Sequence, residues 1–283
     1  MNETLLQHEG AIRLVCFAGI FAAVALWEWS APRRALTASK AVRWASNLAI
    51  VAVNTAVLRV TFPLLAVATA ELAAQRGWGL LNATALPEAL AFVLSVLALD
   101  GVIYLQHVMF HAVPALWRLH RMHHTDLDLD VTTGARFHPI EIALSMGIKL
   151  AAVVLLGPPP GAVLLFEVLL NGTAMFNHGN IRLPLALDRW LRLLVVTPDM
   201  HRVHHSWHPE ETNSNFGFNL PWWDRLCGTY RAQPRDGHTG MTIGIDQFRE
   251  PRELWLHRLL LQPFRGVAGR YAINAAARWD GRA

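Results

Sequence analysis

Charged side chains are scarce in this chain of 283 residues. Aspartate, glutamate, lysine and arginine make up 16% of it, whereas hydrophobic residue types make up 53% and the mean hydropathy is +0.27. A soluble globular domain typically carries about 25% charged residues. The shortage argues against a soluble protein and indicates a membrane protein.

Cysteine is equally scarce, which excludes several classes of redox site. Cys16 and Cys227 belong to no CxxC or zinc-ribbon pattern, so a disulfide scaffold and sulfur-based chemistry are not expected. The sequence also lacks a His-Pro-Gly-Gly haem-binding segment, an iron–sulfur cysteine pattern and a glycine-rich dinucleotide fingerprint. If the chain carries out redox chemistry, its electrons must come from another protein. Its basic residues border apolar segments and form no run that would bind nucleic acid.

Apolar segments divide the chain, and five are visible at residues 11–29, 45–70, 88–99, 140–156 and 162–176. Arg59 and Pro63 interrupt the second segment, which should therefore be kinked. A Gly-Pro-Pro-Pro-Gly turn at residues 157–161, which no helix can cross, joins the last two. These two are near the lower limit of about 17–25 residues for a membrane span, so they form a short spanning hairpin or a re-entrant one. A charge within each, Lys149 and Glu167, favours a structural ion pair over a proton or substrate role.

Histidine, in contrast, is abundant and clustered. Eight of the 14 histidines fall into His107-x-x-x-His111, His120-x-x-His123-His124 and His201-x-x-His204-His205. Helical spacing places positions i, i+3 and i+4 on one face, and imidazoles on converging helices bind transition metals. With His138 and His178 the candidates exceed the three or four ligands of one zinc site. The count favours two metal ions, with the neighbours in each adjacent pair serving different ions; scattered surface or core histidines are the alternative.

The basic residues predict which side of the membrane the histidines occupy. Arg33, Arg34, Lys40 and Arg43 lie between the first two segments, so the positive-inside rule places that loop in the cytoplasm and the amino terminus outside. The third segment and the proline hairpin then return the chain to the same side. All three clusters should face the cytoplasm.

Asp100 and Tyr104 share one helical stripe with His107 and His111. A carboxylate near the bilayer costs about 2.5–3.5 kcal/mol on an insertion scale, so Asp100 should have a partner. It either orients a ligand imidazole through the second ring nitrogen or makes an interhelical hydrogen bond with no bearing on a metal.

The order of the three clusters resembles the membrane-bound fatty acid hydroxylase/sterol desaturase superfamily, as do Asn177-His178-Gly179-Asn180, the motif at residues 213–217 and Trp222-Trp223-Asp224. The resemblance covers residues 90 to 232. It implies an all-α integral membrane bundle whose cytosol-facing, histidine-rich cap holds a dimetal centre. Such proteins use O2 to hydroxylate or desaturate unactivated C–H bonds of lipids.

By this resemblance nine histidines are ligands and four polar residues are candidates for supporting them. The expected ligands are His107, His111, His120, His123, His124, His178, His201, His204 and His205, and the supporting candidates are Asp100, Tyr104, Asn177 and Asn180. Fatty acid hydroxylases carry one more histidine four residues beyond the His178 position, where this chain has Arg182; His138 or His208 is the substitute. The implied cofactors are two iron ions, with zinc possible after purification. The implied partners are a membrane lipid and a separate reductase, ferredoxin or cytochrome.

We expect three regions: N-terminal transmembrane helices at 1–89, the catalytic domain at 90–232 and an amphipathic tail at 233–283. The tail lies on the membrane surface or packs against the catalytic domain. Two other classes of function fit the sequence less well. A zinc-dependent membrane hydrolase needs a general-base carboxylate, as in HExxH, and no histidine cluster contains one. A metal carrier or transporter would distribute its ligands through the membrane, and these gather at one face.

Overall fold

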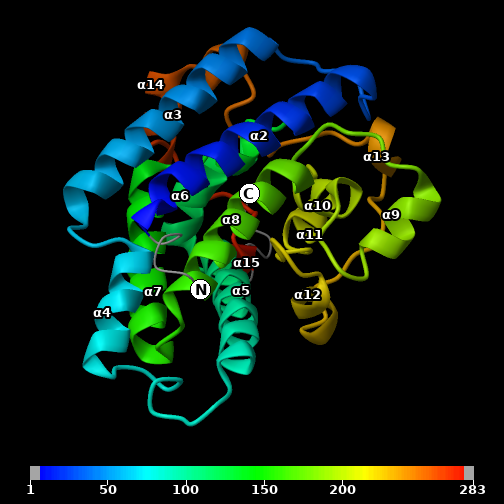
Figure 1. Cartoon of the computed structure of the whole chain (residues 1–283). Helices are drawn as coiled ribbons and strands as arrows, with labels where there is room; N and C mark the ends of the chain where they lie inside the picture. Colours follow the sequence, from blue (N-terminus) through cyan, green and yellow to red (C-terminus); the bar gives the residue numbers. More distant parts are fainter. Residues whose placement is uncertain (1–6, 277–283) are drawn as a thin grey trace.

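Helices account for nearly all regular structure in the computed structural model, which describes residues 7–276 (Figure 1). The longer helices are α2 (Glu9–Ser30), α3 (Lys40–Thr61), α4 (Ala66–Arg76), α5 (Glu88–Ala112), α6 (Pro114–His124), α7 (Pro139–Leu156) and α8 (Pro160–Asn177). The short ones are α9 (Leu185–Leu191), α10 (Pro198–His204), α11 (Pro209–Thr212), α12 (Trp222–Leu226), α13 (Gly237–Gly240), α14 (Leu256–Leu261) and α15 (Ile273–Ala276), with 3-10 turns η1 (Thr133–Ala135), η2 (Pro251–Leu254) and η3 (Gln262–Phe264). Within this range no β-strand forms, so the all-α prediction is confirmed.

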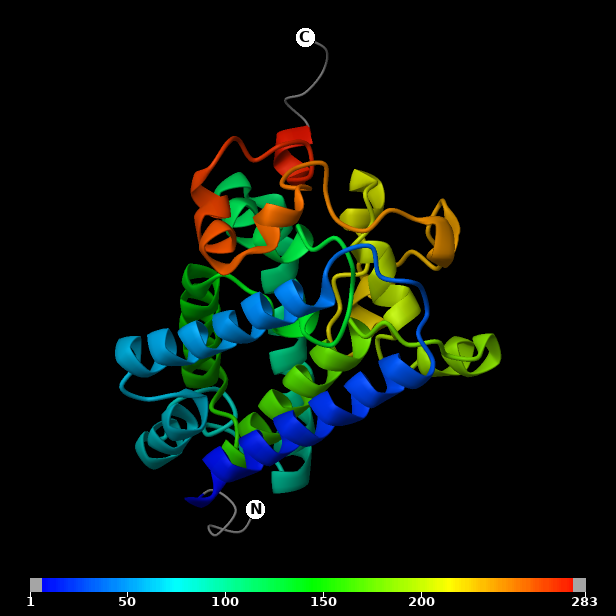
Figure 2. The ribbon, with the colours of Figure 1, turned by 90° about the horizontal axis from the view of Figure 1, so that it is seen from above.

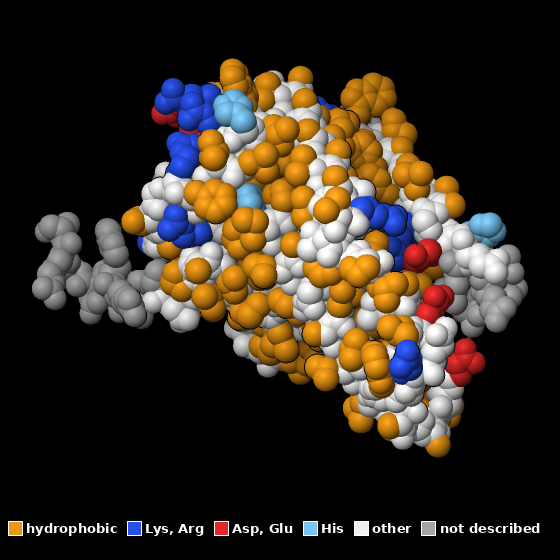
Figure 3. Space-filling view, turned by 90° about the vertical axis from the view of Figure 1, so that its left-hand side faces the viewer, with side chains coloured by type: hydrophobic (Ala, Val, Ile, Leu, Met, Phe, Trp, Pro, Cys, Tyr) orange, Lys and Arg blue, Asp and Glu red, His pale blue; other side chains and the backbone are white. Residues whose placement is uncertain are grey.

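Four stretches are long and apolar enough to cross a membrane: Glu9–Ser30, Lys40–Arg76, Glu88–Ala112 and Pro139–Leu156. Their outer surfaces expose many leucine and valine side chains, and Figure 3 shows one broad hydrophobic face of this kind. The second stretch breaks between α3 and α4 at Pro63, where the sequence predicted a kink. Four candidate spans are thus found where five apolar segments were expected. The fifth segment forms α8, which contacts α2, α4 and α5.

The loops separate into two ends of the helical bundle. At one end, Leu80 and Leu81 donate backbone hydrogen bonds to Leu155 and Leu156, at the turn between α7 and α8. Gly157 ends α7 there with φ of +65°, and its backbone lies so close to Gly79 that a Cβ on Gly79 would meet it at 2.2 Å. At the other end, residues 31–33 pair with residues 180–182. The proline hairpin therefore returns the chain to the end where the histidines lie, as predicted.

The basic residues between α2 and α3 are tied to the histidine-bearing end by ion pairs. Arg33 binds Asp199 at 3.0 Å. Arg43 is completely buried, and its guanidinium pairs with Asp126 at 2.6 Å and with Asp130. These arginines hold the loop and α3 against the cap as well as flanking a membrane segment.

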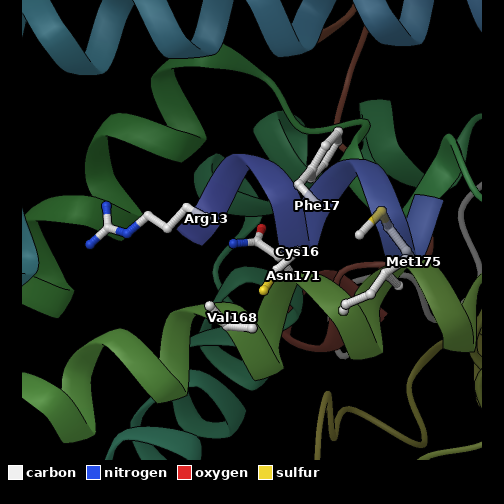
Figure 4. Close-up of a pocket in the computed structure, with 8 residues that line it drawn as sticks. Arg13, Cys16, Phe17, Val168, Asn171 and Met175 are labelled. Carbon is white, nitrogen blue, oxygen red and sulfur yellow. The ribbon is translucent and has the colours of Figure 1, made fainter. Parts of the chain in front are cut away.

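The predicted pair of Lys149 and Glu167 is confirmed, with 2.8 Å between the ammonium nitrogen and a carboxylate oxygen. A third residue, Arg13 of α2, binds the other oxygen of Glu167 at 2.6 Å. Figure 4 shows the crevice beside it, which is lined by Arg13, Cys16 and Phe17 of α2 and by Val168, Asn171 and Met175 of α8. The ion pair therefore links α2, α7 and α8.

The C-terminal tail packs against the cap over its described part. Leu259 is buried with Ile50 and Met122, and the Trp117 indole donates to the Ala268 carbonyl at 3.0 Å. Trp255 and Phe264 remain exposed. Of the two predicted placements, packing against the catalytic domain is the one found; residues 277–283 lie outside the described range.

Candidate metal centre

Nine histidines converge in two buried groups. His107, His111, His120, His124 and His204 form one group, and His123, His178, His201 and His205 form the other. Within each group one ring nitrogen per residue lies within 4.8 Å of all the others. The two groups contain every histidine that the resemblance implied as a ligand.

Adjacent histidines contribute to different groups, as the sequence predicted. His123 and His124 differ in ring plane by 88°, and His204 and His205 by 86°. On a helix, successive side chains project about 100° apart, so two neighbours cannot point at one spot. Each HxxHH cluster therefore supplies both groups.

Hydrogen bonds fix the ring orientation of six histidines. The Nδ1 atom donates to an acceptor in each case: His107 to Phe216 O (2.7 Å), His111 to Asn213 Oδ1 (3.0 Å), His120 to Glu141 Oε1 (2.6 Å), His123 to Arg136 O (3.1 Å), His178 to Ala174 O (2.7 Å) and His204 to Ser214 O (2.8 Å). A carbonyl oxygen only accepts, so the hydrogen resides on Nδ1 and the lone pair on Nε2. A histidine that binds metal usually donates a hydrogen bond from its other ring nitrogen in this way, which fixes the orientation of the ring.

Nε2 atoms of different histidines lie close together although neither atom of a pair carries a hydrogen. Those of His107 and His120 are 3.1 Å apart, and those of His123 and His178 are 3.0 Å apart. With Nδ1 protonated, both atoms of each pair are acceptors and cannot hydrogen-bond. Buried polar atoms in this state are costly unless something binds them. A cation between the nitrogens satisfies them, so the donor set fits a metal ion.

Burial keeps these imidazoles in the neutral form that binds metal. Desolvation, reinforced by neighbouring histidines, lowers the pKa of His123, His124, His201, His204 and His205 well below the ordinary value. Desolvation likewise lowers the pKa of His178 to about 4. Protons therefore compete weakly for these nitrogens near neutral pH.

The four residues expected to support the ligands make their hydrogen bonds to groups other than the histidines of the two groups. Asp100 accepts hydrogen bonds from the Trp223 indole at 2.8 Å and from Leu220 N at 3.3 Å, which is the interhelical alternative. The Tyr104 hydroxyl bonds to Thr229 at 2.9 Å. None of these contacts reaches a ligand histidine.

The two asparagines of the Asn177-His178-Gly179-Asn180 motif brace the chain around His178. Asn177 donates to Phe218 O at 3.1 Å, and Asn180 donates to Arg34 O at 2.8 Å. Their contacts hold loops and not ligand rings.

His138 and His208 stand outside both groups. His138 caps α7, with Nδ1 accepting from Ile140 N at 3.2 Å and Nε2 facing Leu260 O at 3.2 Å. His208 binds Asp236 at 2.7 Å. Among residues 7–276 neither group gains a tenth histidine.

Glu141 is the functional residue that the sequence reasoning missed. It lies in the first turn of the apolar helix α7, is buried, and holds His120. A carboxylate opening an apolar segment two residues after His138-Pro139 was the available signal. Asn213, in the motif at residues 213–217, accepts the hydrogen bond of His111, a role that the motif alone did not indicate.

Comparisons with known proteins identify a family and several relatives. Residues 92–229 match the family model "Fatty acid hydroxylase". The chain is 32% identical over 157 residues to ornithine lipid hydroxylase OlsE of Rhizobium tropici, covering 56% of this chain and 46% of that protein. It is 28% identical over 168 residues to alkylglycerol monooxygenase of Homo sapiens (58% and 35%) and 28% identical over 173 residues to that of Xenopus tropicalis (59% and 36%).

The aligned region spans less than half the length of each of these relatives. No solved structure matches the chain significantly. The family match confirms the resemblance drawn from the three histidine clusters.

Proposed function

Because residues 92–229 match the family model "Fatty acid hydroxylase", we propose that the chain is an O2-dependent oxidoreductase that hydroxylates a C–H bond of a membrane lipid at a diiron centre. The observation that carries the proposal is the pair of adjacent all-histidine groups with converging Nε2 atoms. The names of the relatives, a lipid hydroxylase and monooxygenases, support lipid hydroxylation.

The chemistry of the donor set supports iron. Imidazole suits iron, zinc, copper and nickel. Two iron ions, when bound, would use O2 to attack an unactivated C–H bond, which zinc cannot do because it has no redox chemistry. The nine histidines would hold the metals, and the acceptors on Nδ1 would keep each ring aimed. Zinc would then be an occupant acquired during purification.

The surroundings of the histidines suit an apolar substrate. Phe137 stacks on His123 with centroids 4.4 Å apart, Trp117 lies against His111 at 4.8 Å, and Phe218 against His107 at 5.0 Å. These rings keep water from the site. His107 and His111 lie at the end of the candidate span α5, which supports a centre at the edge of the bilayer, where a lipid chain would arrive. We propose that this edge faces the cytoplasm and that a separate reductase, ferredoxin or cytochrome supplies electrons.

A zinc hydrolase is the second class, and Glu141 argues against it. A hydrolase needs a carboxylate beside the metal-bound water. Glu141 instead bonds to Nδ1 of His120, on the side of the ring away from the converging nitrogens. It orients a ligand and is not placed as a general base.

Lipid analysis of a host with and without the chain tests the proposal. Expression under 18O2 should yield a lipid heavier by one 18O atom, detected by mass spectrometry. His204→Ala should abolish this product, whereas His8→Ala, at an exposed position outside both groups, should not. A desaturated product would mean that the reaction is desaturation and not hydroxylation, within the same class of enzyme. A hydrolysed lipid, or 18O taken from water, would overturn the proposal.

A further inference from the structure

Large apolar side chains are exposed on α9, on the turn that follows it and on α12. Leu185 and Trp190 are 70% exposed, Leu194 is 65% exposed and Leu226 is 77% exposed. None of them belongs to a candidate membrane span. We call residues 185–194 together with α12 the ledge; Figure 1 shows α9 projecting from the side of the molecule.

The two parts of the ledge form one surface. The Trp222 indole donates to Leu193 O at 2.7 Å, and the Arg225 guanidinium donates to Arg192 O at 3.2 Å. α12 is therefore fixed against the turn after α9. The exposed leucines and tryptophans therefore lie on two elements that are joined by hydrogen bonds.

The ledge begins where the first candidate span ends. Arg182 N donates to Ala31 O at 2.9 Å, and Ile181 forms a bridge with Pro32. α9 starts three residues later, and Figure 2 shows it beside the C-terminal end of α2. Trp29, the penultimate residue of α2, is 81% exposed. Exposed tryptophans at the end of a span mark the boundary between acyl chains and headgroups.

The exposed charges of the ledge are all cationic. Arg189 and Arg225 of the ledge are exposed, as is Arg182 shortly before it, whereas Asp188 and Asp224, the two carboxylates of the ledge, are buried. Asp188 pairs with Arg192. An apolar face with arginines and no exposed carboxylate fits a membrane surface that contains anionic lipids.

We propose that the ledge inserts into the membrane interface on the side of the histidine groups, with its leucines and tryptophans among the acyl chains and its arginines at the lipid phosphates. An interfacial helix buries its apolar face by about 5–10 Å. The ledge would thereby set the height of α10 above the bilayer. Asp188 accepts from the Thr197 hydroxyl at 2.6 Å, and Thr197 caps α10, which carries His201 and His204.

Depth-dependent quenching tests the proposal in the intact protein. In a variant with Cys16 and Cys227 replaced by serine, Leu194→Cys would carry an environment-sensitive fluorophore, and Glu210→Cys, at an exposed carboxylate on α11, would be the matched control. The labelled proteins are placed singly in nanodiscs of phosphatidylcholine and phosphatidylglycerol, with and without brominated acyl chains. Metal content verifies folding of each variant, and Leu226→Cys replaces Leu194→Cys if that variant fails to fold.

We expect brominated lipids to quench the label at position 194 at least threefold more than the label at 210. Equal, weak quenching at both positions would overturn the proposal. The proposal would also be overturned if the label at 194 became shielded from water only after a second copy or a soluble redox protein was added, because the ledge would then bind protein.

Discussion

Because neighbouring histidines lie in different groups, each group can be altered separately, and a metal ion bound to each could be removed on its own. Purified protein should contain two metal ions per chain. His124→Ala removes a ligand from the five-histidine group, and His123→Ala removes one from the four-histidine group. Each substitution should lower the metal content to about one ion per chain, because the other group keeps its full ligand set. Elemental analysis against protein concentration measures the content.

His138→Ala is the control for this pair of variants, since His138 lies outside both groups, and it should retain two ions. A native content of one ion, or none with full activity, would refute the dimetal centre. Loss of both ions in either variant would mean that the two groups bind metal only together.

Glu141 should determine how tightly its group holds metal. Glu141→Ala removes the acceptor for His120 Nδ1, and removing such a partner typically weakens metal binding about 10–100-fold. Glu141→Gln keeps an acceptor oxygen and should be milder. Competition with a chelator measures the affinity.

Asp100→Asn is the matched carboxylate control for the Glu141 variants, since Asp100 binds the Trp223 indole and no histidine. It should leave metal affinity unchanged. Equal affinities in Glu141→Ala and the unsubstituted protein would show that His120 needs no partner.

The histidines of the two groups could be predicted from the sequence, but most of their hydrogen-bond partners could not. Histidine side chains at helical spacing are visible in any sequence. The acceptors for His107, His123, His178 and His204 are backbone carbonyls, which every residue possesses. Only the folded chain selects which carbonyl approaches. Glu141 and Asn213 act through side chains and were accessible to sequence reasoning.

At the scale of helices, the ion pair between α7 and α8 should show energetic coupling. Glu167→Leu leaves Lys149 unpaired, whereas Lys149→Met leaves Glu167 with Arg13, so the first variant should lose more thermal stability. In the double variant Arg13 still has Glu9 at 2.9 Å. The stability lost by the double variant should be smaller than the sum of the losses of the two single variants, by about 0.5–3 kcal/mol. Thermal unfolding in one detergent measures all three; additive losses would contradict the coupling.

The long helices could be predicted because apolar runs and Pro63 mark their extent. Of the short helices, α10 was indicated by the helical spacing of its histidines. Helices α9 and α11 to α13 could not be predicted, since four to seven residues carry little periodicity and their directions depend on contacts with distant segments. Arg43 illustrates the same limit. Its sequence context suggested a membrane-flanking charge, but its partners Asp126 and Asp130 lie more than 80 positions away.

At the scale of the whole molecule, the two ends of the bundle should lie on opposite sides of the membrane. The loop between α4 and α5 pairs with the turn between α7 and α8, and the histidine groups lie at the other end with residues 31–33 and 180–182. The basic residues at 33–43 favour the cytoplasm for the histidine end. Chemical labelling of each end requires an exposed position.

Single cysteines at Ala83 and Arg235, both exposed, therefore report the two sides in a background with Cys16 and Cys227 replaced by serine. In intact cells an impermeant thiol reagent should label Ala83→Cys and should reach Arg235→Cys only after permeabilisation. Labelling of both in intact cells would place the histidine end outside. Labelling of Arg235→Cys alone in intact cells would show that the orientation is the reverse of the predicted one. The electron donor would then have to be sought on the opposite side of the membrane.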